Sequence, residues 1–193
     1  ATAALPRASF DWLPLGLVAG LALLALPLIA SPSTWLTLTV AGLAMGMIVF
    51  IIASGLTLVF GLMDVLNFGH GVFIALGAFV ATSVLGAMAD WTTSASLWRN
   101  FAAVLPAMLV AMAVAAAVGW GFERVLVRPV YGQHLKQILI TMGGMIIGEE
   151  FIKVIWGPDQ IPLPLPAAMR GSFVLGDASI EKFRVIATVI GAI

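Results

Sequence analysis

The sequence is dominated by uninterrupted apolar runs that are as long as a membrane-spanning helix. A bilayer core about 30 Å thick needs about 20 mostly apolar residues in a helix. Runs of that kind cover residues 12–30, 35–60, 71–89, 101–122 and 137–156, and a sixth begins near residue 185. We therefore expect an all-α fold, a polytopic transmembrane helical bundle with five complete spans and the start of a sixth, in a single transmembrane domain over residues 1–193.

The composition excludes most other classes of protein. Hydrophobic residues make up 62% of the chain and charged residues 9%, whereas soluble domains carry roughly 25% charged residues. A formal net charge of zero argues against a basic nucleic-acid-binding surface. The chain has no cysteine, so disulfide frameworks and zinc fingers are excluded, and we expect no metal site. All six tryptophans fall at or just beyond the proposed span ends, where an indole ring is favourable.

The two ends of the chain leave its full extent open. It begins without Met and stops at Ile193 inside an apolar run, so we expect it to be a piece of a longer protein. The first apolar run has a secretory signal peptide as its alternative interpretation. We favour a retained helix, because Asp11 stands where a basic leader should be and the run is long.

Charge alone does not orient the chain in the membrane. Lys153 lies within a span, and the other cations divide equally between the two sides: Arg7, Arg124, Arg128 and Lys136 against Arg99, Arg170, Lys182 and Arg184. The longest segment outside the spans, residues 157–184, contains four closely spaced prolines followed by glycines. Proline fixes φ and removes a hydrogen-bond donor, so we expect a stiff extended loop that receives a partner or covers a pathway.

Polar residues and glycines concentrate between the second and third runs. The cluster contains Gly61, Asp64, Asn67, Gly69, His70 and Gly71. It is either a tight turn at the cytoplasmic interface or an interruption that dips into the membrane and lines a path. Asn67 is placed to cap the following helix, whose N-terminus would suit a carboxylate.

The fifth run carries charge inside a predicted span. Glu149 and Glu150 lie in its outer half, and a charge at the bilayer centre costs about 2.5–3.5 kcal/mol on insertion scales. Glu149 and Lys153 are four residues apart and are expected to pair on one helix face, unless this face contacts a subunit or the pathway. Small-xxx-small steps at Gly16/Gly20, Gly42/Gly46 and Gly144/Gly148 predict close helix packing.

One segment resembles a known family. The run from Gly55 to Ala81, with the core Asn67-Phe68-Gly69-His70-Gly71 and then Leu76 to Phe79, resembles the signature of integral-membrane permeases of branched-chain amino acid ABC importers, the leucine/isoleucine/valine type. Supporting matches follow at Glu123-Arg124, Arg128-Pro129, Thr141-Met142-Gly143 and Trp156-Gly157-Pro158. Glu149 and Glu150 depart from the family pattern, in which uncharged polar residues are frequent.

The resemblance implies a multi-pass transport subunit of the bacterial inner membrane, not an enzyme. No GxxxxGK[ST] motif occurs, so ATP and Mg would be bound by two cytoplasmic ATPase subunits and this chain itself would need no cofactor. A second homologous permease and a periplasmic solute-binding protein would complete the importer of branched-chain or related amino acids, and membrane lipid would surround it. The family's layout places residues 124–136 in the cytoplasm and residues 157–184 outside.

The resemblance also assigns roles that can be tested. The cluster of Gly61, Asp64, Asn67, Gly69, His70 and Gly71 would shape the substrate pathway, with glycine allowing close backbone approach. Arg124, Arg128 and Pro129 would make cytoplasmic contacts, and Glu149, Glu150 and Lys153 would face a subunit or the pathway. The alternative functions are an ion-coupled secondary transporter or channel that uses Asp64, Glu149 or Glu150, and a non-transporting assembly subunit.

Overall fold

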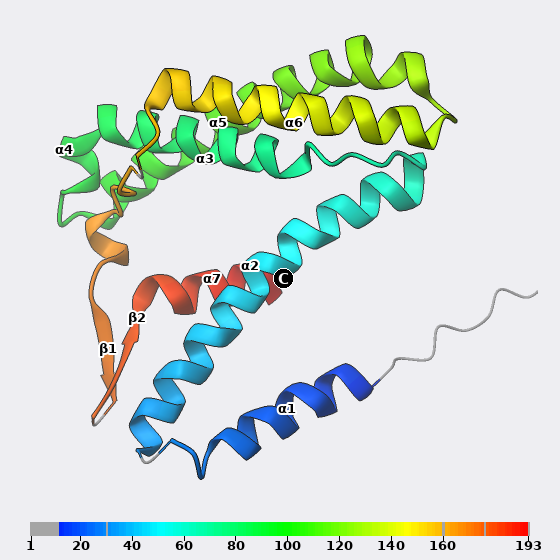
Figure 1. Cartoon of the computed structure of the whole chain (residues 1–193). Helices are drawn as coiled ribbons and strands as arrows, with labels where there is room; N and C mark the ends of the chain where they lie inside the picture. The colour runs from blue at the N-terminus through cyan, green and yellow to red at the C-terminus, as the bar shows by residue number, and fades with distance from the viewer. Residues whose placement is uncertain (1–11, 30, 160, 176, 193) are drawn as a thin grey trace, which may run out of the picture.

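The computed structural model describes residues 12–29, 31–159, 161–175 and 177–192, and this part of the chain is mostly helical (Figure 1). Three of its helices are long and apolar enough to cross a membrane. They are α2 (Pro32–Met63), α3 (His70–Ala87), and α5 (Leu97–Phe122) together with the turns that prolong it to Val130. The prediction of a mostly helical chain with long apolar helices that can span a membrane is therefore confirmed.

The first predicted span is shorter in the structure than expected. Helix α1 (Leu13–Ala25) has 13 residues, which is about 20 Å at 1.5 Å per residue and less than the thickness of the bilayer core. The apolar run continues to residue 30, but Pro27 has no backbone N–H with which to continue the helical hydrogen bonds, although Leu26 before it keeps helical backbone angles. Hydrophobic length alone therefore overestimated this helix. Arg7 and Asp11 lie outside the described residues.

Helices α3, α5 and α6 (His134–Trp156) lie side by side and carry the packed centre of the molecule (Figure 1). Leu85 of α3 is buried against Ala103 and Ala107 of α5, where small side chains allow the two helices to come close. Helix α6 begins three residues before the predicted span and ends with it at Trp156. Its charged residues, Lys136, Glu149, Glu150 and Lys153, distinguish it from α2 and α3, which contain no Asp, Glu, Lys or Arg.

Helix α2 slopes away from this group, and α7 (Lys182–Ala192) lies along it (Figure 1). Among the described residues of α2, Ala44 alone is buried, so most of its apolar surface is exposed. A Cβ added at Gly191 of α7 would lie 2.5 Å from Met47 Cβ, so the glycine permits the contact between the two helices.

The segment that links α6 to α7 is only partly the extended loop that the sequence predicts. It contains a short helical turn, η3 (Ala167–Met169), and an antiparallel hairpin of β1 (Ser172–Leu175) and β2 (Ala178–Glu181), in which Ser172 pairs with Glu181. Strand β2 lies beside α2 and buries Ala178 and Ile180 (Figure 1). The prolines keep residues 161–166 free of helix, as predicted.

The chain alternates between two ends of the helical group. The end of α2, the start of α3, and the connection from α5 to α6 lie at one end, while the short helix α4 (Ala89–Thr92) and residues 157–170 lie at the other (Figure 1). Each tryptophan lies in or next to the terminal turn of a helix, as predicted for an interfacial residue. The segments predicted to be cytoplasmic therefore gather at a single end.

The three predicted glycine steps differ in what they contact. A Cβ at Gly148 would lie 2.6 Å from Val72 Cγ1 of α3, and one at Gly144 would collide with the Phe122 ring of α5. Close packing at this step of α6 is confirmed. At Gly16, Gly20, Gly42 and Gly46, an added Cβ would meet nothing within 4 Å among the described residues.

Candidate functional site

The helical path of the chain is broken between α2 and α3, at the polar cluster that the sequence singles out. Helix α2 ends at Met63, residues 64–67 are irregular, and α3 begins at His70. Asp64 ends α2 in the left-handed region, at φ 53°, while its N–H still bonds to the Phe60 carbonyl at 3.0 Å. Asp is one of the few L residues that adopt this conformation without a large penalty. We call residues 64–69 the break.

Asn67 acts within the break rather than as the predicted helix cap. Its Oδ1 accepts a hydrogen bond from the Gly69 N–H at 3.0 Å, and the residue that precedes α3 is Gly69. An Asn side chain that bonds the backbone two residues on forms a turn of its own. The prediction that Asn67 caps the helix is therefore wrong by two residues.

Two buried polar side chains of α6 hold the break, and sequence reasoning missed both. Gln137 is 1% exposed, and its Oε1 lies 3.4 Å from the Leu66 nitrogen, which donates to it. Thr141 is fully buried, and its hydroxyl lies 3.2 Å from the Leu66 carbonyl and 2.7 Å from the Gln137 carbonyl. Helix α6 thus accepts from the Leu66 N–H, and the single Thr141 hydroxyl proton is within reach of the Leu66 carbonyl as well as of two carbonyls of α6. The sequence did carry a sign of this contact, because two uncharged polar residues four positions apart lie on the same face of an otherwise apolar stretch of helix.

The glycines of the cluster differ in their surroundings. Gly69 is buried, and a Cβ there would lie 3.2 Å from Asn67 Oδ1, 3.6 Å from the Thr141 carbonyl and 3.8 Å from Phe122. A Cβ at Gly61 or Gly71 would meet nothing within 4 Å among the described residues. The close backbone approach expected of these glycines is therefore found at Gly69.

A cavity of about 430 Å³ lies between the last turns of α2 and the break. Asn67, His70 and Gly71, three of the predicted pathway residues, line it, whereas Gly61, Asp64 and Gly69 do not. His70 reaches back toward α2, where a Cβ at Gly55 would lie 3.1 Å from its Nε2. The remaining walls are mainly apolar, with one further hydroxyl: Ile52, Leu56, Thr57, Phe60, Val65, Leu66 and Phe68.

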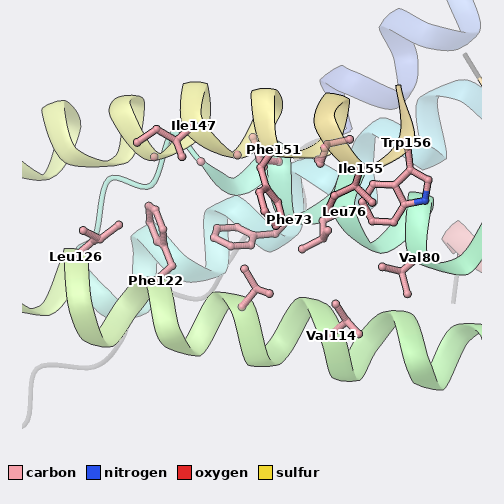
Figure 2. A pocket seen from close by; sticks show the side chains of 16 residues that line it. Phe73, Leu76, Val80, Val114, Phe122, Leu126, Ile147, Phe151, Ile155 and Trp156 are labelled. Atoms are coloured by element: carbon pink, nitrogen blue, oxygen red, sulfur yellow. The ribbon is translucent and has the colours of Figure 1, made fainter. Parts of the chain in front are cut away.

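A second cavity, of about 360 Å³, lies between α3, α5 and α6 and is lined by apolar side chains (Figure 2). The Phe73 and Phe122 rings meet edge to face across it, with centroids 5.3 Å apart. Trp156 closes one end and donates from Nε1 to the Ser83 hydroxyl at 2.7 Å (Figure 2). This cavity offers no partner for an ammonium or carboxylate group, so we place the candidate site at the break.

Charged residues surround the break at its end of the molecule. Asp64 Oδ2 lies 3.7 Å from His134 Nε2, at the start of α6. The connection from α5 to α6 begins with a wide helical turn, η1 (Glu123–Val127), and a tight one, η2 (Arg128–Val130). Beyond it, the Tyr131 hydroxyl donates to Glu123 Oε1 at 2.6 Å. That hydrogen bond raises the pKa of the Tyr131 hydroxyl, because the carboxylate stabilises its protonated form.

The predicted cytoplasmic residues lie in this same connection. Arg124 stands over the Trp120 ring, with its guanidinium carbon 6.0 Å from the ring centroid. Arg124, Arg128 and Pro129 are all exposed. They are therefore available for a contact at the end of the molecule that carries the break.

The acidic pair of α6 is remote from the break. Glu149 follows His134 by 15 positions, which is about 22 Å along a helix. The predicted Glu149–Lys153 pair is wrong, because Lys153 Nζ pairs instead with Glu150 Oε1 at 2.7 Å, three residues away. Glu149 and Glu150 are both exposed. Within the described residues no three His, Asp or Glu side chains converge to hold a metal ion.

Comparison with known proteins connects the break to a family. The family model described as "Branched-chain amino acid transport system / permease component" matches residues 38–191. The high-affinity branched-chain amino acid transport system permease protein LivH of Salmonella typhimurium is 29% identical over 153 residues, which are 79% of this chain and 47% of that protein. LivH of Escherichia coli K12 is 28% identical over the same length.

A third relative is the permease protein BraD of Pseudomonas aeruginosa, from the same kind of transport system. It is 31% identical over 147 residues, which are 74% of this chain and 45% of that protein. The chain thus spans about half the length of the curated relatives it matches. No solved structure matches it.

Proposed function

The chain belongs to the family of permease components of branched-chain amino acid transport systems, and on this premise we propose that it is one of two permease subunits of an ATP-driven amino acid importer. The family is one of membrane transport components rather than enzymes. In the proposed importer, two cytoplasmic ATPase subunits bind ATP and Mg. A periplasmic binding protein delivers a branched-chain or related amino acid.

The observation that carries this proposal is the cavity at the break, which lies inside the matched residues. Asn67 and His70 bring an amide and an imidazole into a space with mostly aliphatic and aromatic walls. An aliphatic amino acid has the matching chemistry, because its polar end needs hydrogen-bonding groups and its side chain needs apolar contact. Irregular backbone at membrane depth is tolerated where it lines a water-filled path.

The membrane arrangement follows from the same proposal. Besides the three long apolar helices, α6 crosses the bilayer, with Glu150 and Lys153 paired in its outer half. The first apolar run, of which α1 covers 13 residues, and the run that begins in α7 complete the five spans and the start of a sixth. The connection from α5 to α6 faces the cytoplasmic ATPases, and the hairpin of β1 and β2 faces the binding protein.

Reconstitution of the full-length protein tests the proposal. Proteoliposomes that contain both permeases and the ATPases, with ATP inside and the loaded binding protein outside, should accumulate leucine. Liposomes without ATP should not, even when a proton or sodium gradient is applied. Uptake that needs only the ion gradient would refute the proposal and favour ion coupling through Asp64, Glu149 or Glu150. Full uptake without this chain would make it a non-transporting subunit.

A further inference from the structure

One buried amide joins two segments that are far apart in the sequence. Gln137 Oε1 accepts from the Leu66 N–H of the break at 3.4 Å, and Gln137 Nε2 donates to the Val130 carbonyl at 3.3 Å. Val130 ends the connection formed by η1 and η2, residues 123–130, which we call the elbow. A single side chain therefore spans from the elbow to the wall of the candidate cavity.

The surroundings make this link stiff. Gln137 is 1% exposed, and Val65 and Val130 beside it are 4% and 7% exposed. A buried amide that loses its partners incurs a desolvation cost of about 1–3 kcal/mol, so the side chain has few alternative positions. The Gln amide is planar, with an acceptor oxygen on one side and an NH₂ donor group on the other, so the directions of its two hydrogen bonds are linked. A shift of the Val130 carbonyl must therefore move the break or break a hydrogen bond.

The elbow departs from α-helical geometry along its whole length. Its first part, Glu123–Val127, is a π-helical turn, and its second part, Arg128–Val130, is a 3₁₀ turn. A 3₁₀ turn is frequent in connections between helices, whereas a π-helical turn is rare and is frequently found at functional sites. Its exposed face carries Arg124 and Arg128. A partner that binds this face can act on the elbow directly.

We propose that Gln137 is a positioning residue that transmits movement of the elbow to the break, and so couples a cytoplasmic partner to the substrate cavity. The inference rests on the proposed function, since it assigns the cytoplasmic partner to the ATPases. The Thr141 hydroxyl also reaches the break, at the Leu66 carbonyl, but its hydrogen-bond partners among the described residues are Leu66, Gln137 and Ile138 and include no residue of the elbow. It therefore supplies the matched control.

The test uses the full-length protein in the assembled importer and compares Gln137→Leu with Thr141→Val. Both substitutions remove polar atoms from buried positions, but only the first disconnects the elbow. We expect Gln137→Leu to retain ATP hydrolysis while the leucine transported per ATP falls roughly tenfold, which is within the usual range of coupling between sites. Thr141→Val should transport as much leucine per ATP as the wild type, even if its rates of uptake and ATP hydrolysis fall together.

Three outcomes overturn the inference. The first is a wild-type number of leucine molecules transported per ATP in Gln137→Leu. The second is a fall of leucine uptake and ATP hydrolysis by the same factor in that variant. The third is an equal loss of leucine transported per ATP in Thr141→Val, which would indicate that both residues only anchor the break. Absence of ATP-driven leucine uptake by the wild-type importer is a different result. It refutes the proposed function itself.

A second measurement does not depend on how the variants fold. The chain has no native cysteine, so spin labels can be attached at Phe68→Cys in the break and Val125→Cys in the elbow, both at exposed positions. With Gln137 in place, the distance between the labels should stay the same in the nucleotide-free and ATP-bound importer while the elbow moves relative to α3. A change of that distance on ATP binding would overturn the inference.

Discussion

The contact between α3 and α6 at Gly148 gives a quantitative prediction for Gly148→Ala. The new Cβ would lie 2.6 Å from Val72 Cγ1, roughly 1 Å inside the favourable carbon–carbon separation. Val72 is β-branched and strongly prefers one χ1 rotamer in a helix, so rotating the colliding methyl group away is unfavourable. Overpacking of this kind costs about 1–3 kcal/mol, and the higher helix propensity of Ala offsets about 0.5–1 kcal/mol of it. We expect a net loss of about 0–2.5 kcal/mol of unfolding free energy, with a mid-range value of about 1 kcal/mol.

The assay is reversible unfolding of the full-length protein in mixed micelles, with Gly143→Ala as the matched control. Gly143 lies on the same helix, and a Cβ there would meet nothing within 4 Å. That variant should match or slightly exceed the wild-type stability. Val72→Ala should restore stability in the Gly148→Ala background, because it removes the colliding methyl group. Equal stabilities of Gly148→Ala and Gly143→Ala would refute the packing argument.

Three further predictions concern the break and the far end of α6. Gly71→Leu should abolish leucine uptake but leave assembly intact, since an added Cβ meets open space beside the cavity; normal uptake would remove Gly71 from the pathway. Asp64→Ala should lower stability by about 1 kcal/mol, because Ala disfavours the left-handed conformation, whereas Asp64→Gly should not; unfolding of the two variants compares them directly. Trp156→Phe should lower the unfolding free energy by about 0.5–1.5 kcal/mol, because the hydrogen bond to Ser83 is lost. In a double-mutant cycle, Trp156→Phe should cause no further loss of this hydrogen-bond energy once Ser83→Ala is present.

The sequence located the break but not the way in which it is held. Glycines and polar residues within an apolar stretch indicate an interruption, and the structure ends α2 at Met63 and starts α3 at His70. The amino-acid type of Asn67 did not predict its role, since Asn is favourable both as a helix cap and in a turn. The choice depends on the position of α6, which binds Leu66 from 71 residues away.

Other features depended on contacts that periodicity does not encode. Lys153 stood at a suitable spacing from both Glu149 and Glu150, and the structure pairs it with Glu150. The hairpin was missed because the prolines dominated the interpretation of residues 157–184. Its signal was the pair Gly176-Asp177 between two short runs, which is a typical hairpin connection.

The cavity at the break is the centre of the proposed pathway, and cysteine accessibility at Gly71 tests this most directly. Gly71→Cys in the reconstituted importer should react with a membrane-impermeant maleimide, at a rate that changes when ATP and the loaded binding protein are added. Val154→Cys, at an outward-facing position of α6 that is 81% exposed, should stay unmodified, because the proposed membrane arrangement places this face of α6 in the bilayer. A Gly71→Cys thiol that does not react, or that reacts at one rate in every state, would contradict the pathway at the break.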